Sequence, residues 1–214
     1  MKRIQFITHL NAQYSYLEGA RYALEGGCRW IQLRMKGEHP DEIIKTGLQL
    51  RKLCDQFQAT LIIDDHVALV EKIGADGVHL GQTDMPIDQA RNILGNNKII
   101  GGTANTLEEI RKLYHLGADY IGCGPFRYTT TKKNLAPILG LEGYENLLIY
   151  MSEEEIDLPL IAIGGIRRED ISPLMQTGVS GIAISSALLS APDPKEEMKL
   201  FIQDMEPYGK TTED

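Results

Sequence analysis

Four segments of the chain share one pattern of hydrophobic and polar positions. Each starts with glycine, continues through a short turn into an apolar run, and ends in glycine or polar residues. The segments begin at Gly26, Gly74, Gly117 and Gly178, so their starts are separated by 48, 43 and 61 residues. That spacing is too long for one strand and one helix, and it fits two such units. We therefore expect each segment to hold every second strand of a longer alternating series.

Further apolar runs of strand length lie between these segments, and helical patterns fill the gaps. The additional strands are expected at 4–8, 61–63, 98–101 and 160–163. The helices are expected at 16–24, 41–57, 67–73, 87–94, 106–116, 143–152, 170–176 and 194–205. Thr106 followed by Glu109 has the form of a capping box, which supports that helix start in particular.

Eight short apolar strands that alternate with helices predict an α/β fold, a single (β/α)8 TIM barrel. Strands that are buried on both faces are typical of a parallel sheet covered by helices. We expect residues 1–206 to form the barrel domain and residues 207–214 to be a polar C-terminal tail. A doubly wound open sheet is the alternative. The fourfold recurrence favours closure, because a barrel gives every second strand an equivalent environment.

Composition agrees with a globular domain and narrows the class of partner. The chain has 214 residues, of which 43% are apolar, and this supports a sizeable core. A net charge of -8 and a pI near 5.2 argue against a nucleic-acid surface, which needs a basic stripe. A basic cluster at one small anionic ligand is still compatible with that charge.

The cysteines and the apolar runs indicate the cellular compartment of the protein. Cys28, Cys54 and Cys123 form no CxxC pair, and we expect them to be small buried residues in a reducing compartment. No apolar run approaches the roughly 20 residues that cross a bilayer, and no signal-peptide core follows the first residues. We therefore expect a cytoplasmic protein without a membrane segment. Its oligomeric state is not legible in the sequence.

An acid follows each of two successive expected strands. The strand at 61–63 is followed by Asp65, and the strand at 77–80 is followed by Asp84. Two strands joined by a helical crossover lie parallel, so both carboxylates leave the sheet at the same edge. Mg²⁺ takes oxygen ligands and fills its shell with water and phosphate, so Asp65 and Asp84 are candidate Mg²⁺ ligands. The alternative is that Asp65 caps the next helix and Asp84 sits in a polar turn.

A basic pair follows the second expected strand. Gln32, Arg34 and Lys36 alternate along the chain, so their side chains point to one face. Arg34 and Lys36 together could hold a di-anionic group, the arginine through its two-pronged guanidinium and the lysine as a point charge. The alternative is a solvated basic rim.

Three other strand ends carry groups suited to an anion. The segment 101–103 offers backbone amides and a hydroxyl, a weak signal by itself. Gly164 and Gly165 follow the seventh expected strand, and Ser185 and Ser186 follow the eighth. Barrels commonly bind phosphate in these last two loops, where glycine permits close approach of the backbone. The alternative for the glycine pair is a tight turn that needs positive φ, and both interpretations can hold.

A threonine-rich basic segment, residues 126–133, follows the sixth expected strand, and the chain stays irregular to about Gly140. Long irregular segments in compact domains are usually functional or disordered. We favour a lid that grips an anion over a flexible surface loop.

These residues together resemble the thiamine phosphate synthase family over nearly the whole chain, from Ile4 to about Leu189. The matching segments are IQLRMK from Ile31, IIDDHVAL from Ile62, GVHLGQTDMP from Gly77, IIGGT from Ile99, DYIGCGPFRYTTTKKNLAPILGLEGY from Asp119, AIGGI from Ala162 and GIAISSAL from Gly181. Their order along the chain makes the combination specific.

The resemblance implies a transferase that joins an aminopyrimidine pyrophosphate to thiazole phosphate, giving thiamine phosphate and pyrophosphate. It implies that Mg²⁺ is held by Asp65 and Asp84. The residues implied at the pyrimidine pyrophosphate are Gln32, Arg34, Lys36, Asp64, Thr103 and Lys132, and Arg34, Lys36 and Lys132 would promote departure of pyrophosphate. The residues implied at the thiazole phosphate are Thr129, Thr131, Gly165, Ser185 and Ser186. Because the thiazole nitrogen attacks directly, no enzyme nucleophile is required, in agreement with the lack of a Ser-His or Cys-His arrangement at the strand ends.

The sequence departs from the family pattern at several positions. Asp64 stands where asparagine is usual, and Gln5 stands where the first strand often has tyrosine. Arg127 and Tyr128 replace an apolar residue and a proline. We interpret His79 as a hydrogen-bonded core residue and the tyrosines as packing residues.

Two other functions use the same fold and some of the same residues. A thiazole tautomerase-like isomerase would bind only the thiazole phosphate, and a non-catalytic thiamine-precursor binding protein would never release pyrophosphate. The acid pair together with the Arg-Lys pair argues for the synthase, because an isomerase has no pyrophosphate to hold.

Overall fold

The computed structural model describes residues 4–128 and 137–208. The strands are β1 Ile4–Ile7, β2 Trp30–Leu33, β3 Thr60–Asp64, β4 Gly77–Leu80, β5 Ile99–Ala104, β6 Tyr120–Cys123, β7 Leu160–Ile163 and β8 Gly181–Ile184. The helices are α1 Tyr16–Glu25, α2 Pro40–Gln56, α3 Val70–Ile73, α4 Ile87–Leu94, α5 Leu107–His115, α6 Gly140–Glu153, α7 Ile171–Gln176, α8 Ser186–Leu189 and α9 Pro194–Met205. Short 3₁₀ turns occupy Val67–Leu69, Arg168–Asp170 and Glu206–Tyr208.

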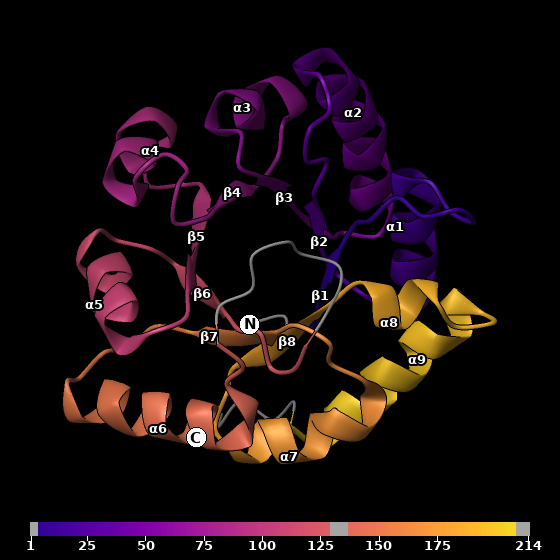
Figure 1. Ribbon diagram of the computed structural model, residues 1–214. Coiled ribbons are helices and arrows are strands. Elements are labelled where there is room, and N and C mark those ends of the chain that lie inside the picture. Colours follow the sequence, from indigo (N-terminus) through magenta and orange to yellow (C-terminus); the bar gives the residue numbers. More distant parts are fainter. Residues whose placement is uncertain (1–3, 129–136, 209–214) are drawn as a thin grey trace.

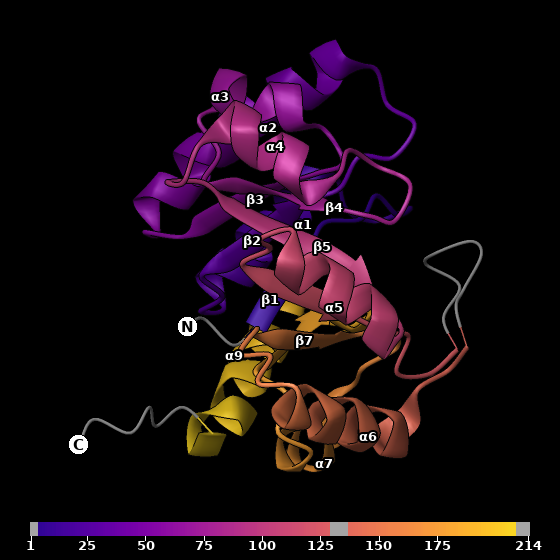
Figure 2. The same cartoon turned by 90° about the vertical axis from the view of Figure 1, so that its left-hand side faces the viewer.

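The strands close into a parallel barrel. Within the described residues β1 to β8 pair in sequence order, and β8 returns to pair with β1. Figure 1 shows the strands as a ring inside the helices, and Figure 2 shows the barrel from the side, with α2, α3 and α4 on one flank and α6, α7 and α9 on the other. Closure confirms the predicted (β/α)8 barrel and excludes the doubly wound sheet.

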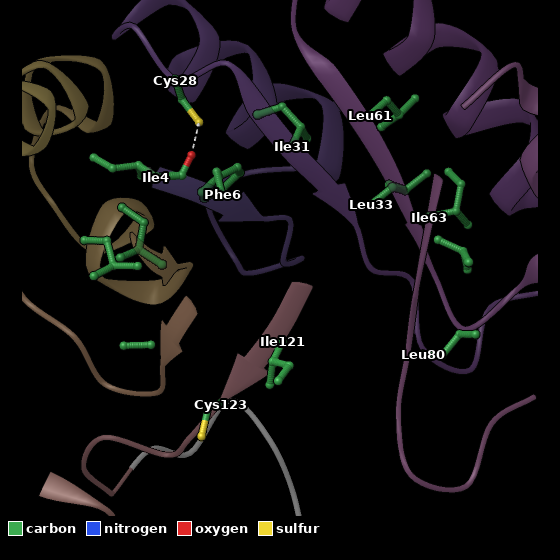
Figure 3. Packing of buried hydrophobic residues seen from close by; sticks show 14 of the residues in the cluster. Ile4, Phe6, Cys28, Ile31, Leu33, Leu61, Ile63, Leu80, Ile121 and Cys123 are labelled. Carbon is green, nitrogen blue, oxygen red and sulfur yellow. Dashed lines mark hydrogen bonds between the residues drawn. The ribbon is translucent and has the colours of Figure 1, made fainter. Parts of the chain in front are cut away.

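One set of strand side chains points outward and packs under the helices. Along β1, for example, Ile4 and Phe6 belong to this outer core, and Leu24 of α1 packs in the same cluster. Figure 3 shows side chains of this core from β1 to β4 and β6, together with the Cys28 thiol, which donates to the Ile4 carbonyl at 3.6 Å. Burying each large apolar side chain contributes about 1.5–3 kcal/mol, so this layer supplies most of the stability of the fold.

The alternate side chains point into the barrel and form a smaller second core. Its buried members are Ile7, Trp30, Ile62, Tyr120, Ile161 and Ala183. The Tyr120 ring contacts the Trp30 ring edge to face, with centroids 4.9 Å apart. This interior has room for two large rings because glycine faces them: a Cβ added at Gly101 would lie 2.1 Å from Cζ of Tyr120, and one at Gly122 would lie 3.0 Å from Cε1 of His79.

Most of the predicted elements are confirmed, with four differences. The fifth strand was expected to end at Gly101, but β5 continues to Ala104, so Thr103 is a strand residue and not a loop residue. The expected helix at 67–73 is a 3₁₀ turn followed by the single turn of α3, and α6 begins at Gly140 instead of Gly143. The short helix α8 was not predicted. The capping box of Thr106 and Glu109 is present at the start of α5.

The end of the described chain lies on the barrel. The Tyr208 hydroxyl donates to Oγ of Ser172 in α7 at 2.8 Å. Across residues 4–128 and 137–208, none of the helices combines the length and apolar character needed to span a membrane.

The glycine at position 101 generates a stability prediction. We expect Gly101→Ala to lower the free energy of unfolding by about 1–3 kcal/mol, because the added methyl group must displace the Tyr120 ring inside a closed barrel. Urea denaturation followed by circular dichroism measures this change.

Gly37→Ala is the matched control. Gly37 has a φ of 83° and no atom within 4 Å of an added Cβ, so its cost is only the strain of the left-handed backbone, about 1 kcal/mol. A loss at Gly101 no larger than the loss at Gly37 would contradict the packing argument.

Candidate active site

The polar ends of the strands converge at one mouth of the barrel. All eight strands are parallel, so the residues that follow β2, β3, β4, β5, β7 and β8 come to the same end. Two groups of predicted residues meet there, one around Asp64 and one around Asp65.

The first group joins β2 to β3 through Asp64. Gln32 Nε2 donates to Asp64 Oδ1 at 2.5 Å, and Arg34 Nε lies 3.5 Å from Asp64 Oδ2. The Arg34 amide donates to Oγ1 of Thr8 at 3.0 Å, so the end of β1 holds the arginine backbone. Arg34 is therefore a paired and mostly buried group, and the alternative of a solvated basic rim is wrong for it.

The second group joins the ends of β3 and β4 through Asp65. Its backbone amide donates to the His79 carbonyl at 2.9 Å, and its φ of 65° lies in the left-handed region. Lys36 Nζ lies 3.6 Å from Asp65 Oδ2, and the Asp84 carboxylate lies within hydrogen-bonding reach of Asp65. Asp84 is held in turn by the Gly81 amide, which donates to Oδ2 at 2.6 Å.

The alternative role of Asp65 as a helix cap is wrong. The turn Val67–Leu69 has His66 at its N-cap position and no side-chain cap hydrogen bond. The alternative for Asp84 agrees with the structure, because its bond to Gly81 closes a polar turn. That turn uses one carboxylate oxygen and leaves the other available to a ligand.

The acids at this mouth have perturbed protonation. Burial, followed by the neighbouring Asp65 carboxylate, raises the pKa of Asp64 to about 7, although Arg34 acts in the opposite direction. Burial and then the Asp84 carboxylate raise the pKa of Asp65 above its ordinary value. Adjacent carboxylates without a cation between them hold their protons more tightly.

The Asp65 and Asp84 pair fits Mg²⁺ better than a metal that needs many protein ligands. In the described part of the chain no group of three or more His, Cys, Asp or Glu side chains is arranged to hold a metal. Mg²⁺ typically takes one or two carboxylates and completes its octahedron with water and substrate phosphate oxygens. Two carboxylates within hydrogen-bonding reach of each other, beside a lysine, meet that requirement.

The residues predicted to bind phosphate follow β7 and β8, on the opposite side of the ring of strands from β3 and β4. Oγ of Ser185 is buried and has no hydrogen-bond partner among the described residues. Gly165 has a φ of 69°, and a Cβ there would lie 2.5 Å from Cγ of Arg127, so the expected turn with positive φ is present and phosphate binding at this glycine stays a prediction. Ser186 is exposed and begins α8.

Thr103 lies inside the mouth and is linked to the barrel interior. Nε2 of His79 lies 3.0 Å from Oγ1 of Thr103, and Nδ1 of the same ring lies 3.1 Å from the Tyr120 hydroxyl. The interpretation of His79 as a hydrogen-bonded core residue is thus confirmed. The interpretation of the tyrosines as packing residues is incomplete for Tyr120, because its hydroxyl is hydrogen-bonded.

Thr129, Thr131 and Lys132 lie outside the described residues, so their predicted roles remain predictions. At the base of that segment Arg127 donates to the Gly165 carbonyl at 3.2 Å and pairs with Asp170. The sequence reasoning missed this link and the role of Thr8. The expected first strand at 4–8 includes Thr8, whereas β1 ends at Ile7, and Arg127 stands out in the sequence only as a departure from the family pattern.

The raised pKa of Asp64 predicts the effect of pH on stability. The unfolded chain loses the Asp64 proton near the ordinary pKa of 3.8, whereas the folded protein keeps this proton up to about pH 7. The free energy of unfolding therefore falls as pH rises from 3.8 to about 7. In buffer with chelator we expect Asp64→Asn to be more stable than the wild type, by an amount that grows between about pH 4 and about pH 7. Thermal unfolding at several pH values measures it.

Asp157→Asn removes the same charge at an exposed position and serves as the control. Equal gains for the two variants at every pH would contradict the assignment to Asp64.

Comparison with known proteins agrees on one family and one fold. A family model described as thiamine monophosphate synthase matches residues 4–188. A thiamine-phosphate synthase from Bacteroides fragilis is 59% identical over 202 residues, which cover 94% of this chain and 99% of that protein. One from Flavobacterium johnsoniae is 44% identical over 203 residues, which cover 95% of this chain and 94% of that protein.

A solved structure agrees with the sequence relatives. Thiamine phosphate pyrophosphorylase from Pyrococcus furiosus superposes with a TM-score of 0.86 at 33% identity, and the match covers 98% of each chain. Because the family model, the relatives and this structure all span nearly the whole barrel, the chain belongs to the thiamine monophosphate synthase family.

Proposed function

We propose that the chain joins 4-amino-2-methyl-5-(diphosphooxymethyl)pyrimidine to thiazole phosphate with the help of Mg²⁺ at Asp65 and Asp84. The bond from the pyrimidine methylene carbon to the pyrophosphate oxygen breaks, and a bond from that carbon to the thiazole nitrogen forms. The products are thiamine phosphate and pyrophosphate. The observation that carries the proposal is that the Asp65 and Asp84 carboxylates lie within hydrogen-bonding reach of each other beside Lys36, with Arg34 on the neighbouring strand end.

The leaving pyrophosphate would be bound by the basic pair. Arg34 presents a guanidinium suited to two phosphate oxygens. Lys36, which lies 3.6 Å from Asp65, is more than half exposed and therefore accessible to an anion. When bound, Mg²⁺ would offset the charge that develops on the departing oxygen. Lys132 belongs to the same proposal, as a further cation at the pyrophosphate.

Asp64 acts in this proposal through its neighbours and not as a metal ligand. It accepts from Gln32 and faces Arg34, and so it orients both side chains toward the mouth. Oε1 of Gln32 is buried without a partner among the described residues, which leaves it as an acceptor for the substrate.

No enzyme nucleophile takes part. Departure of pyrophosphate leaves a cation on the methylene carbon that the electron-rich aminopyrimidine stabilises, and the thiazole nitrogen supplies the electron pair. Cys54 and Cys123 are unsuited to attack, because burial raises the pKa of each to about 12 and keeps both thiols protonated.

The thiazole phosphate would lie between the loops after β7 and β8. Oγ of Ser185 offers a buried donor, and Gly165 would contribute its backbone amide to the phosphate. Ser186, Thr129 and Thr131 complete the proposed phosphate site. The three free cysteines agree with our proposal of a cytoplasmic location.

The overall proposal is tested by pyrophosphate release. With both substrates and Mg²⁺ we expect steady release of pyrophosphate and equal formation of thiamine phosphate, and with chelator we expect both to stop. Omitting thiazole phosphate should also stop release, because the cation has no acceptor. Binding of thiazole phosphate without any pyrophosphate release would favour the isomerase or the non-catalytic binding protein.

The metal assignment is tested at Asp84. We expect Asp84→Asn to lower the rate of pyrophosphate release by roughly 10²-fold and to raise the Mg²⁺ concentration needed for half-maximal rate, because one of two anionic ligands is lost. Asp88→Asn, an exposed acid in the first turn of α4, is the control and should leave both quantities unchanged. An unaltered Mg²⁺ requirement in Asp84→Asn would remove Asp84 from the metal site.

A further inference from the structure

A chain of hydrogen bonds crosses the interior of the barrel behind the proposed site. Nε2 of Gln5 donates to the Tyr120 hydroxyl at 3.2 Å, this hydroxyl lies 3.1 Å from Nδ1 of His79, and Nε2 of His79 lies 3.0 Å from Oγ1 of Thr103. The four residues come from β1, β6, β4 and β5. Gln5, Tyr120 and His79 are at most 9% exposed, whereas Thr103 is half-buried at the mouth.

The order of donors along this chain follows from the inventory of hydrogens. The Tyr120 hydroxyl has one hydrogen, and burial raises the pKa of Tyr120, so the hydrogen is retained. Since its oxygen already accepts from Gln5, this hydrogen is directed to Nδ1 of His79. The neutral imidazole then carries its own hydrogen on Nε2 and donates it to Oγ1 of Thr103.

This order leaves the Thr103 hydroxyl with a hydrogen to give. Its oxygen accepts from His79, and among the described residues no acceptor for its hydrogen is present. The Thr103 backbone is also held, because the Gln82 side chain donates to its carbonyl. The hydroxyl is therefore a donor with a fixed oxygen, at the mouth where the pyrimidine pyrophosphate is proposed to bind.

The surrounding packing is built for the two rings of this chain. Glycine at positions 101 and 122 leaves the space that the Tyr120 and His79 rings fill. The Trp30 ring also contacts the Tyr120 ring, edge to face. The rings cannot turn far within a closed interior, so the hydrogen-bond directions are maintained.

We infer that Gln5, Tyr120 and His79 are positioning residues that set the Nε2–H tautomer of His79 and thereby make Thr103 a fixed hydrogen-bond donor to an acceptor atom of the aminopyrimidine substrate. The inference rests on the proposed function for the identity of the ligand. The tautomer and its cause are properties of the free protein and do not depend on it.

The first experiment measures the tautomer. Long-range proton–nitrogen NMR spectra of the ¹⁵N-labelled protein distinguish a protonated ring nitrogen from an unprotonated one, and the His79 signals are assigned by their loss in His79→Gln. We expect a single Nε2–H form in the wild type and a mixture of tautomers in Tyr120→Phe. A wild-type His79 ring protonated on Nδ1 would reverse the direction of the hydrogen bonds from Tyr120 to Thr103 and overturn the inference.

Tyr144→Phe is the matched control. Tyr144 is equally buried, and its hydroxyl donates to the Cys123 carbonyl at 2.7 Å, outside this chain. It should lose stability as Tyr120→Phe does and yet keep the Nε2–H form of His79. A change of tautomer in Tyr144→Phe as well would assign the effect to general loosening of the core and overturn the inference.

The second experiment measures steady-state kinetics with each substrate varied in turn. We expect Tyr120→Phe to raise KM for the pyrimidine pyrophosphate about 3- to 10-fold, the effect of one misdirected neutral hydrogen bond, and to leave KM for thiazole phosphate unchanged. A merely structural role would lower the active fraction and the apparent kcat without raising one KM selectively. Equal increases in both KM values would overturn the inference.

A double-mutant cycle shows whether Tyr120 acts through Thr103. Thr103→Val should raise the same KM, Thr103→Ser should restore it, and adding Tyr120→Phe to Thr103→Val should have no further effect. Additive effects would overturn the inference. If the wild type forms no thiamine phosphate, the proposed function fails, while the NMR result still decides whether Tyr120 sets the tautomer of His79.

Discussion

Closure of the sheet is the constraint on which the rest of the structure depends. A closed barrel sends alternate side chains of every strand into one narrow interior and sends the others under the helices. The interior cannot hold a large side chain at every position, so Tyr120 and His79 fit only because Gly101 and Gly122 face them. The same closure brings the ends of all eight strands to one mouth, where side chains distant in sequence become neighbours.

At that mouth the chain concentrates opposite charges. Asp64 faces Arg34, and Asp65 faces Lys36. Asp84 accepts a hydrogen bond from the Gly81 amide and lies within hydrogen-bonding reach of Asp65. Three carboxylates beside two cations leave an excess of negative charge. Burial first, and then the neighbouring carboxylates, raise the pKa values of Asp64 and Asp65. A hard divalent cation would offset that excess and would bring a pyrophosphate with it. A transferase whose leaving group is pyrophosphate uses this arrangement directly.

The interior and the mouth are connected. Gln32 and Arg34 contact Asp64 at the mouth of the barrel. The hydrogen-bond series that starts at Gln5 in the interior ends at Thr103, at the same mouth. Gln5 stands where the first strand of the family often has tyrosine. Its side-chain amide donates to the hydroxyl of Tyr120 in β6, so the polar lining of the interior has no gap at this position. The departure at position 64 has a local explanation of the same kind, since a carboxylate there accepts from Gln32 and also faces Arg34.

The sequence by itself determined the architecture and the strand ends at which the candidate site residues lie. The recurring glycine-turn-strand pattern and the acids after two successive strands are local signals, and parallel connection places such acids at one edge whatever the details of packing. The partnerships were decided only by the tertiary structure. Three partnerships depend on which strands become neighbours and on where glycine leaves space. They are the contacts of Asp64 with Gln32 and Arg34, of Arg127 with Gly165 and Asp170, and of Tyr120 with His79. These contacts join residues from different strands, and no pattern along the chain records the distance between two side chains that only closure of the barrel brings together.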